Sequence, residues 1–106
     1  DDEVAKMVEA YDQRRRFLID ALRGMGLECF EPEGAFYIFP SIKKTGLSSQ
    51  EFCEQLIEKH RVAVVPGDAF GKCGEGYIRV SYAYSLQHIK TALERIRLFL
   101  EDLGVL

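Results

Sequence analysis

Apolar residues at the start of the chain recur at steps of three, four and seven residues, which predicts a long amphipathic helix. This apolar face consists of Val4, Met7, Val8, Tyr11, Leu18, Leu22 and Met25. The helix is expected to end at Gly24 or Gly26, because glycine commonly closes helices.

Two further helices are predicted from capping residues followed by apolar stripes. The first runs from about Ser48 to Lys59, where Ser48 and Glu51 have the spacing of a capping box. The second follows Ser85, a suitable N-cap. Its apolar stripe is Leu86, Ile89, Leu93, Ile96, Leu100 and Leu103.

Four short apolar runs between these helices predict strands. They are Leu27 to Phe30, Ala35 to Phe39, Val62 to Val65 and Gly76 to Ala83. The resulting order is helix, two strands, helix, two strands, helix. We therefore expect residues 1–106 to form one α+β domain, a two-layer sandwich with a small, mostly antiparallel sheet and helices on one face.

The last strand carries an arginine in the middle of an alternating pattern. Side chains on a strand alternate between faces. One face is predicted to hold Ile78, Val80 and Tyr82, and the other Tyr77, Arg79 and Ser81. The first face is typical of a core, whereas the second would look toward solvent, a ligand or another domain.

Composition excludes several classes of protein. A net charge of -3 argues against nucleic acid as the main partner, because phosphate binding needs a concentrated positive surface. The basic run Arg14 to Arg16 has acidic neighbours and fits a solvated helix face. No apolar run is long enough to span a membrane, and the three cysteines lack paired spacing, which favours a reducing, cytoplasmic location.

Most candidate sites have a simpler structural interpretation. The cysteines and the two histidines, His60 and His88, are too scattered to predict a metal site. Nothing in the sequence supplies a base to activate a cysteine nucleophile. The glycine-rich segment 71–76 lacks the ending of a phosphate loop and precedes a strand, so we expect a flexible connection there.

Arg79 is the strongest candidate for a functional residue. A guanidinium offers two parallel donors that match a carboxylate, and a strand holds its base rigidly. An arginine on the outer face of a sheet can equally be solvated. If it binds a ligand, a small anionic molecule is expected.

Three segments carry a resemblance to a known family. They are Pro32 to Pro40 (PEGAFYIFP), Val64 to Gly71 (VVPGDAFG) and Tyr77 to Ala83 (YIRVSYA). In order and spacing they resemble the C-terminal small domain of class I and II pyridoxal-phosphate-dependent aminotransferases, enzymes of fold type I. The resemblance extends over nearly the whole chain.

The resemblance implies roles for particular residues. Arg79 corresponds to the arginine that binds the substrate α-carboxylate, and Gly34 and Phe36 match positions lining the substrate side of the cleft. The alternative interpretation is that Gly34 only forms a turn and that Phe36 is only a core residue. The family's cofactor is pyridoxal 5'-phosphate (PLP), but no lysine here matches its lysine motif. We therefore assign no catalytic, cofactor-binding or metal-binding residue to this chain.

The same resemblance implies that the chain is a piece of a longer enzyme, inactive by itself. The complete enzyme would transfer an amino group between an amino acid and a 2-oxo acid and form a homodimer through its large domain, with the isolated piece a monomer. Which amino acid it uses is left open. Two alternatives remain: a free-standing, ferredoxin-like regulatory module in which Arg79 binds a small carboxylate, and a pure interaction domain.

Overall fold

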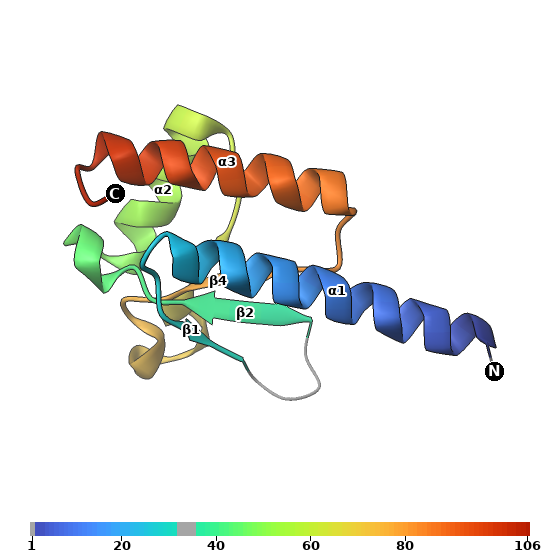
Figure 1. Ribbon diagram of the computed structural model, residues 1–106. Coiled ribbons are helices and arrows are strands. Elements are labelled where there is room, and N and C mark those ends of the chain that lie inside the picture. Colours follow the sequence, from blue (N-terminus) through green and yellow to red (C-terminus); the bar gives the residue numbers. More distant parts are fainter. Residues whose placement is uncertain (1, 32–35) are drawn as a thin grey trace.

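The computed structural model describes residues 2–31 and 36–106. Within them the predicted order of helices and strands is confirmed (Figure 1). The elements are α1 (Asp2–Gly24), β1 (Cys29–Phe30), β2 (Tyr37–Pro40), α2 (Ser49–His60), β3 (Val65–Pro66), β4 (Ile78–Ser81) and α3 (Leu86–Asp102). Short 3-10 helices occupy the connections: η1 (Lys43–Thr45), η2 (Gly67–Phe70) and η3 (Lys72–Gly74).

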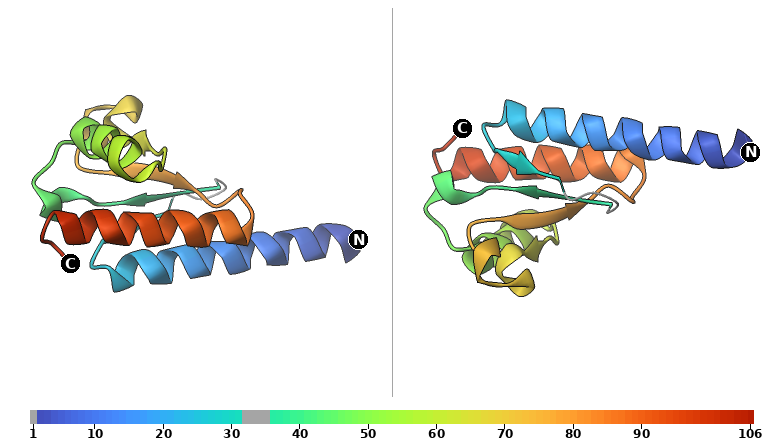
Figure 2. Two further views of the ribbon diagram at one scale, coloured as in Figure 1. Left: turned by 90° about the horizontal axis from the view of Figure 1, so that it is seen from above. Right: turned by 90° about the horizontal axis from the view of Figure 1, so that it is seen from below.

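The strands form one antiparallel sheet in the order β1-β2-β4-β3. β4 therefore lies between two neighbours, with Val80 opposite Ile38 of β2 and Arg79 opposite Val65 of β3. Figure 2 shows α1 and α3 running side by side along the sheet, and α2 packs against α3 and β3. The predicted α+β two-layer architecture is confirmed.

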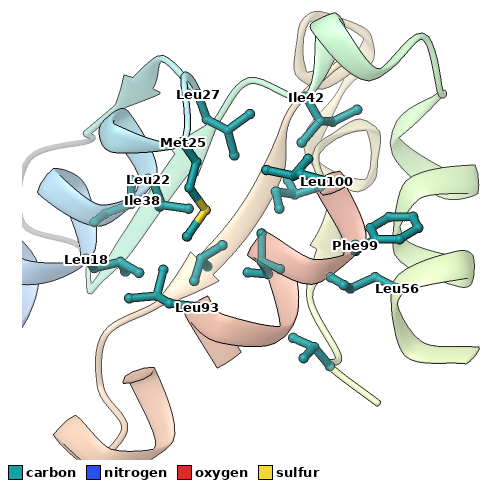
Figure 3. Close-up of a cluster of buried hydrophobic side chains, with 14 of the residues drawn as sticks. Leu18, Leu22, Met25, Leu27, Ile38, Ile42, Leu56, Leu93, Phe99 and Leu100 are labelled. Atoms are coloured by element: carbon teal, nitrogen blue, oxygen red, sulfur yellow. The ribbon is translucent and has the colours of Figure 1, made fainter. Parts of the chain in front are cut away.

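A single hydrophobic core lies between the helices and one face of the sheet (Figure 3). Each helix contributes fully or almost fully buried side chains to it, such as Leu22 from α1, Leu56 from α2 and Leu100 from α3. Ile38 and Ile78 supply the sheet side of this core and are 0% exposed. Burying these large aliphatic side chains contributes about 1.5–3 kcal/mol each, so the core fixes which face of the sheet turns inward.

The apolar face predicted for α1 is buried only in its second half. Leu18 and Leu22 are in the core, whereas Val4, Met7 and Val8 are 55%, 55% and 63% exposed. Figure 2 shows the reason: the N-terminal half of α1 extends beyond the sheet and beyond α3. Although α1 has 23 residues, no helix in the described part of the chain is both long and apolar enough to cross a membrane.

The predicted N-caps are confirmed. The Ser48 hydroxyl accepts a hydrogen bond from the Glu51 amide, and the Glu51 carboxylate accepts one from the Ser48 amide, which completes the capping box of α2. The Ser85 hydroxyl accepts a hydrogen bond from the His88 amide at the start of α3. These bonds satisfy helix-end amides that would otherwise lack partners.

The third strand begins later than predicted. The sequence placed it at Val62 to Val65, but β3 comprises only Val65 and Pro66. Arg61, the C-cap of α2, adopts a left-handed conformation with φ 61°. The chain therefore turns sharply after the helix, and Val62 goes into the core. Pro66 is tolerated within a strand because β3 lies at the edge of the sheet.

The glycine-rich connection before β4 is a closely packed structure rather than the loose linker that we expected. Gly67 and Gly74 face each other so closely that a Cβ on Gly74 would lie 2.0 Å from the Gly67 carbonyl oxygen. The Gly67 amide also donates a hydrogen bond to the Tyr77 carbonyl at 2.7 Å. At this connection glycine permits close backbone approach, which fixes η2 and η3 against the start of β4.

This packing predicts that Gly74→Ala lowers the free energy of unfolding by about 2–3 kcal/mol, because the added methyl group must push two backbone segments apart. The measurement is urea denaturation of the purified chain. Gly24→Ala is the matched control, since a Cβ there meets nothing within 4 Å. It should leave the stability unchanged or slightly higher. Equal denaturation midpoints for the two variants would contradict the close packing.

Candidate functional site

Arg79 lies on the face of β4 that points away from the core. Its neighbours along the strand, Ile78 and Val80, are 0% and 8% exposed, whereas Arg79 and Ser81 are partly exposed. The alternation predicted from the sequence is therefore confirmed. Because the strand is held on both sides by β2 and β3, the backbone that carries Arg79 is fixed.

Two aromatic rings surround the Arg79 guanidinium. Its Cζ atom lies over the Tyr37 ring, 4.2 Å from the ring centroid, and 4.7 Å from the centroid of the Phe70 ring. Tyr37 belongs to β2, whereas Phe70 is the last residue of η2. A guanidinium is attracted to the electron-rich faces of such rings. Its N–H groups form no hydrogen bond with another described residue, so their donors are available to a ligand.

Arg79 differs from the paired arginines of the structure because it forms an ion pair with no described carboxylate. Arg15 bridges Asp12 and Glu31, and Arg97 bridges Glu94 and Glu101. Within residues 2–31 and 36–106, Arg79 forms no ion pair and no hydrogen bond through its side chain; its contacts there are with the two rings.

This arrangement can bind a planar anion. A guanidinium whose donors have no partner among the described residues can form two parallel, charge-assisted hydrogen bonds to a carboxylate. The two rings lie close to the guanidinium, and apolar surroundings strengthen electrostatic attraction. Arg79 cannot act as an acid or base, because arginine does not lose its proton in proteins. The site is therefore suited to binding and orienting a ligand.

Of the other two predicted site residues, Phe36 packs away from Arg79. The Phe36 ring lies 4.9 Å from the ring of Tyr11 and 6.0 Å from that of Tyr82, measured between centroids. It thus belongs to a separate aromatic cluster between α1 and the end of β4. Gly34 lies outside the described residues. A role for either residue in substrate binding stays a prediction.

The sequence analysis missed Tyr37 and Phe70 as neighbours of Arg79. Tyr37 was accessible in principle, because strand alternation puts it on the opposite face from the buried Ile38. Phe70 gives no such signal. It lies in a connection without periodicity, and only the packing of that connection against β4 brings its ring to the arginine.

The histidines and the buried Cys53 form no competing site among the described residues. No cluster of metal-binding side chains occurs in the part of the chain that the structure describes. His60 Nε2 lies 2.8 Å from Asp102 Oδ2 and joins the ends of α2 and α3. Burial raises the pKa of the Cys53 thiol to about 11, with a smaller contribution from Asp68. Its reactive thiolate form is therefore scarce at neutral pH.

The lysines of the chain do not fit a covalently bound aldehyde cofactor such as PLP. A lysine that forms a Schiff base is activated by a desolvated or cationic setting. All six lysines are instead exposed. Lys44 donates a hydrogen bond to the Met25 carbonyl, and Lys43 lies over the Tyr77 ring. We therefore derive no chemical step through PLP from these residues.

Comparison with known proteins gives one consistent result. Residues 1–96 match the family model for class I and II aminotransferases. The chain is 48% identical, over 93% of its length, to an aspartate aminotransferase of Pyrococcus abyssi and to aromatic-amino-acid aminotransferase 2 of Thermococcus litoralis. An aromatic aminotransferase from Pyrococcus horikoshii OT3 has a structure similar to 99% of this chain, with a TM-score of 0.92 and 46% sequence identity.

These matches cover only part of each relative. The chain spans 25% of the two curated enzymes and 28% of the solved Pyrococcus horikoshii chain. The family model nevertheless covers most of the present sequence. The chain therefore belongs to the family of class I and II aminotransferases.

Proposed function

We propose that the chain is the C-terminal small domain of a PLP-dependent aminotransferase and that Arg79 binds the α-carboxylate of the substrate. The observation that carries this proposal is the environment of Arg79. Its guanidinium lies against Tyr37 and Phe70 and has no carboxylate partner among the described residues. A substrate carboxylate would supply the missing partner.

In the complete enzyme, the PLP site would lie outside the present chain. The relatives are about four times as long as the matched region, since it makes up 25% of them. The exposed setting of all six lysines supports a PLP site outside this chain. We propose that the remainder of the protein holds PLP and the catalytic lysine, and that the whole enzyme is a homodimer. By itself, the domain would be inactive.

The proposed reaction transfers an amino group between an amino acid and a 2-oxo acid. Two relatives at the same 48% identity are named for different substrates, one for aspartate and one for aromatic amino acids. A domain that is equally similar to both is suited to recognise what these substrates share. The α-carboxylate is such a group, and it is also present in the 2-oxo acid products.

Arg79 would contribute by positioning the substrate. Two hydrogen bonds to one carboxylate fix both the location and the rotation of the bound amino acid, which a single contact cannot do. Binding would also draw the small domain toward the rest of the enzyme if the carboxylate were held from both sides. No proton transfer is assigned to the arginine.

A free-standing regulatory module is the weaker alternative. It would use the same arginine to sense a small carboxylate, and its relatives would be expected among ligand-binding proteins. The match of residues 1–96 to aminotransferases supports the enzyme instead.

In the complete enzyme, Arg79→Lys is expected to lower kcat/KM for amino acids about 100-fold, a loss of about 2.7 kcal/mol. A lysine retains the charge but cannot form the two parallel hydrogen bonds. Steady-state kinetics and the visible absorbance of bound PLP should be measured together, because cofactor binding is expected to persist.

The matched control is Arg97→Lys on α3, which alters an arginine paired with Glu94 and Glu101. It should leave kcat/KM within about twofold of the parent, as a surface substitution. If Arg79→Lys were equally harmless, the assignment of the carboxylate to Arg79 would be wrong.

The isolated chain is expected to bind PLP at no specific site. Titration with PLP should produce no saturable, one-to-one change in visible absorbance, because the exposed lysines offer only weak, nonspecific reaction. Saturation at one equivalent, abolished by replacing one particular lysine, would place the cofactor site within this chain and refute the proposed division of the enzyme.

A further inference from the structure

Phe70 is an unusual residue for an exposed connection. Phe70 lies in the short helix η2, and this large aromatic residue is 51% exposed. Its ring nevertheless has defined neighbours. It meets the Phe39 ring edge-on, with centroids 6.0 Å apart and an interplanar angle of 85°. The Arg79 guanidinium lies over it at 4.7 Å.

The backbone that carries Phe70 is tied to the strand that carries Arg79. The Gly67 amide donates to the carbonyl of Tyr77, two residues before Arg79. Gly67 also packs directly on Gly74, which closes the connection from the other side. Gln50 of α2 donates a hydrogen bond to the Asp68 carboxylate within the same turn. The ring and the guanidinium are therefore attached to one rigid unit.

The contact with the Phe70 ring reduces the conformational entropy that the Arg79 guanidinium loses when it binds an anion. A free arginine side chain samples many rotamers, and ordering it weakens binding. A ring that already attracts the guanidinium removes part of that cost. The N–H donors stay available for the anion, because the Arg79 side chain forms no hydrogen bond with another described residue.

We propose that Phe70 is a positioning residue, which holds the Arg79 guanidinium against its ring and thereby tightens carboxylate binding. This inference rests on the function proposed above and extends it to a residue of the glycine-rich connection. On this proposal, the close packing of Gly67 and Gly74 contributes to ligand binding, because it sets the position of the Phe70 ring.

Three variants separate positioning from a structural role. Phe70→Leu removes the ring, and Phe70→Tyr retains it, with the added hydroxyl able to reach solvent. The matched control is Phe17→Leu on α1, where the ring is also partly exposed, at 38%, and also has a cation over it, Lys90. All three should unfold within about 3 °C of the parent, because the substituted rings are partly exposed.

The first readout is independent of enzyme activity. In ¹⁵N NMR spectra of the chain, the Arg79 Nε–H signal is identified by its disappearance in Arg79→Lys. Phe70→Leu is expected to shift this signal and to speed rotation about the Nε–Cζ bond, since the ring current and the restraint from Phe70 are lost while the contact with Tyr37 remains. Phe70→Tyr and Phe17→Leu should leave it near its original position. An unmoved signal in Phe70→Leu would overturn the proposal.

The second readout is the KM for the amino-acid substrate in the complete enzyme. Phe70→Leu should raise KM roughly three- to tenfold, the effect of losing one cation–π contact. kcat should stay within about twofold, because the carboxylate contact is made equally in the ground and transition states. Phe70→Tyr should restore the parent KM, and Phe17→Leu should not change it.

The outcomes distinguish this inference from the function on which it rests. If Arg79→Lys lowers kcat/KM as expected while Phe70→Leu behaves like Phe17→Leu, only the role of Phe70 is refuted. If Arg79→Lys also leaves the kinetics unchanged, both proposals fail. A rise in KM that Phe70→Tyr does not reverse would likewise refute positioning by the ring.

Discussion

The central strand β4 can bury only one of its two faces, because the helices form a single core with one side of the sheet. Ile78 and Val80 occupy that core, so the intervening Arg79 must point to the open side. Pairing with β2 and β3 prevents the strand from rotating or shifting its register. A shift by one residue would bury the guanidinium, at a large cost in desolvation.

The environment of Arg79 then decides what the open face can do. Some arginines of this structure form local ion pairs, as Arg15 does with Asp12 and Glu31. Arg79 instead lies against Tyr37 and Phe70. These aromatic contacts do not use its hydrogen-bond donors, which have no partner among the described residues. We propose that this arginine binds an anion that comes from outside the domain.

Local sequence patterns predicted the fold. Features that depend on more distant structure, namely the start of β3, the position of Phe70 and the exposure of Met7, were not predicted. Alternation along one strand placed Arg79 on the outer face, and the three-residue spacing between Ser48 and Glu51 located the cap at Ser48; both are confirmed. The late start of β3 was not predictable, because it follows from the left-handed conformation of Arg61. Nor was the approach of Phe70, which depends on two glycines packing together. The exposure of Met7 likewise depends on how far α1 extends beyond the sheet.

The most direct test of the account is a crystal structure of the complete enzyme with a bound 2-oxo acid. The account predicts that two N–H groups of Arg79 donate to the two oxygens of the ligand carboxylate. The guanidinium plane should keep its contacts with Tyr37 and Phe70. A carboxylate held elsewhere in the active site, with Arg79 directed to solvent or to a protein carboxylate, would contradict it.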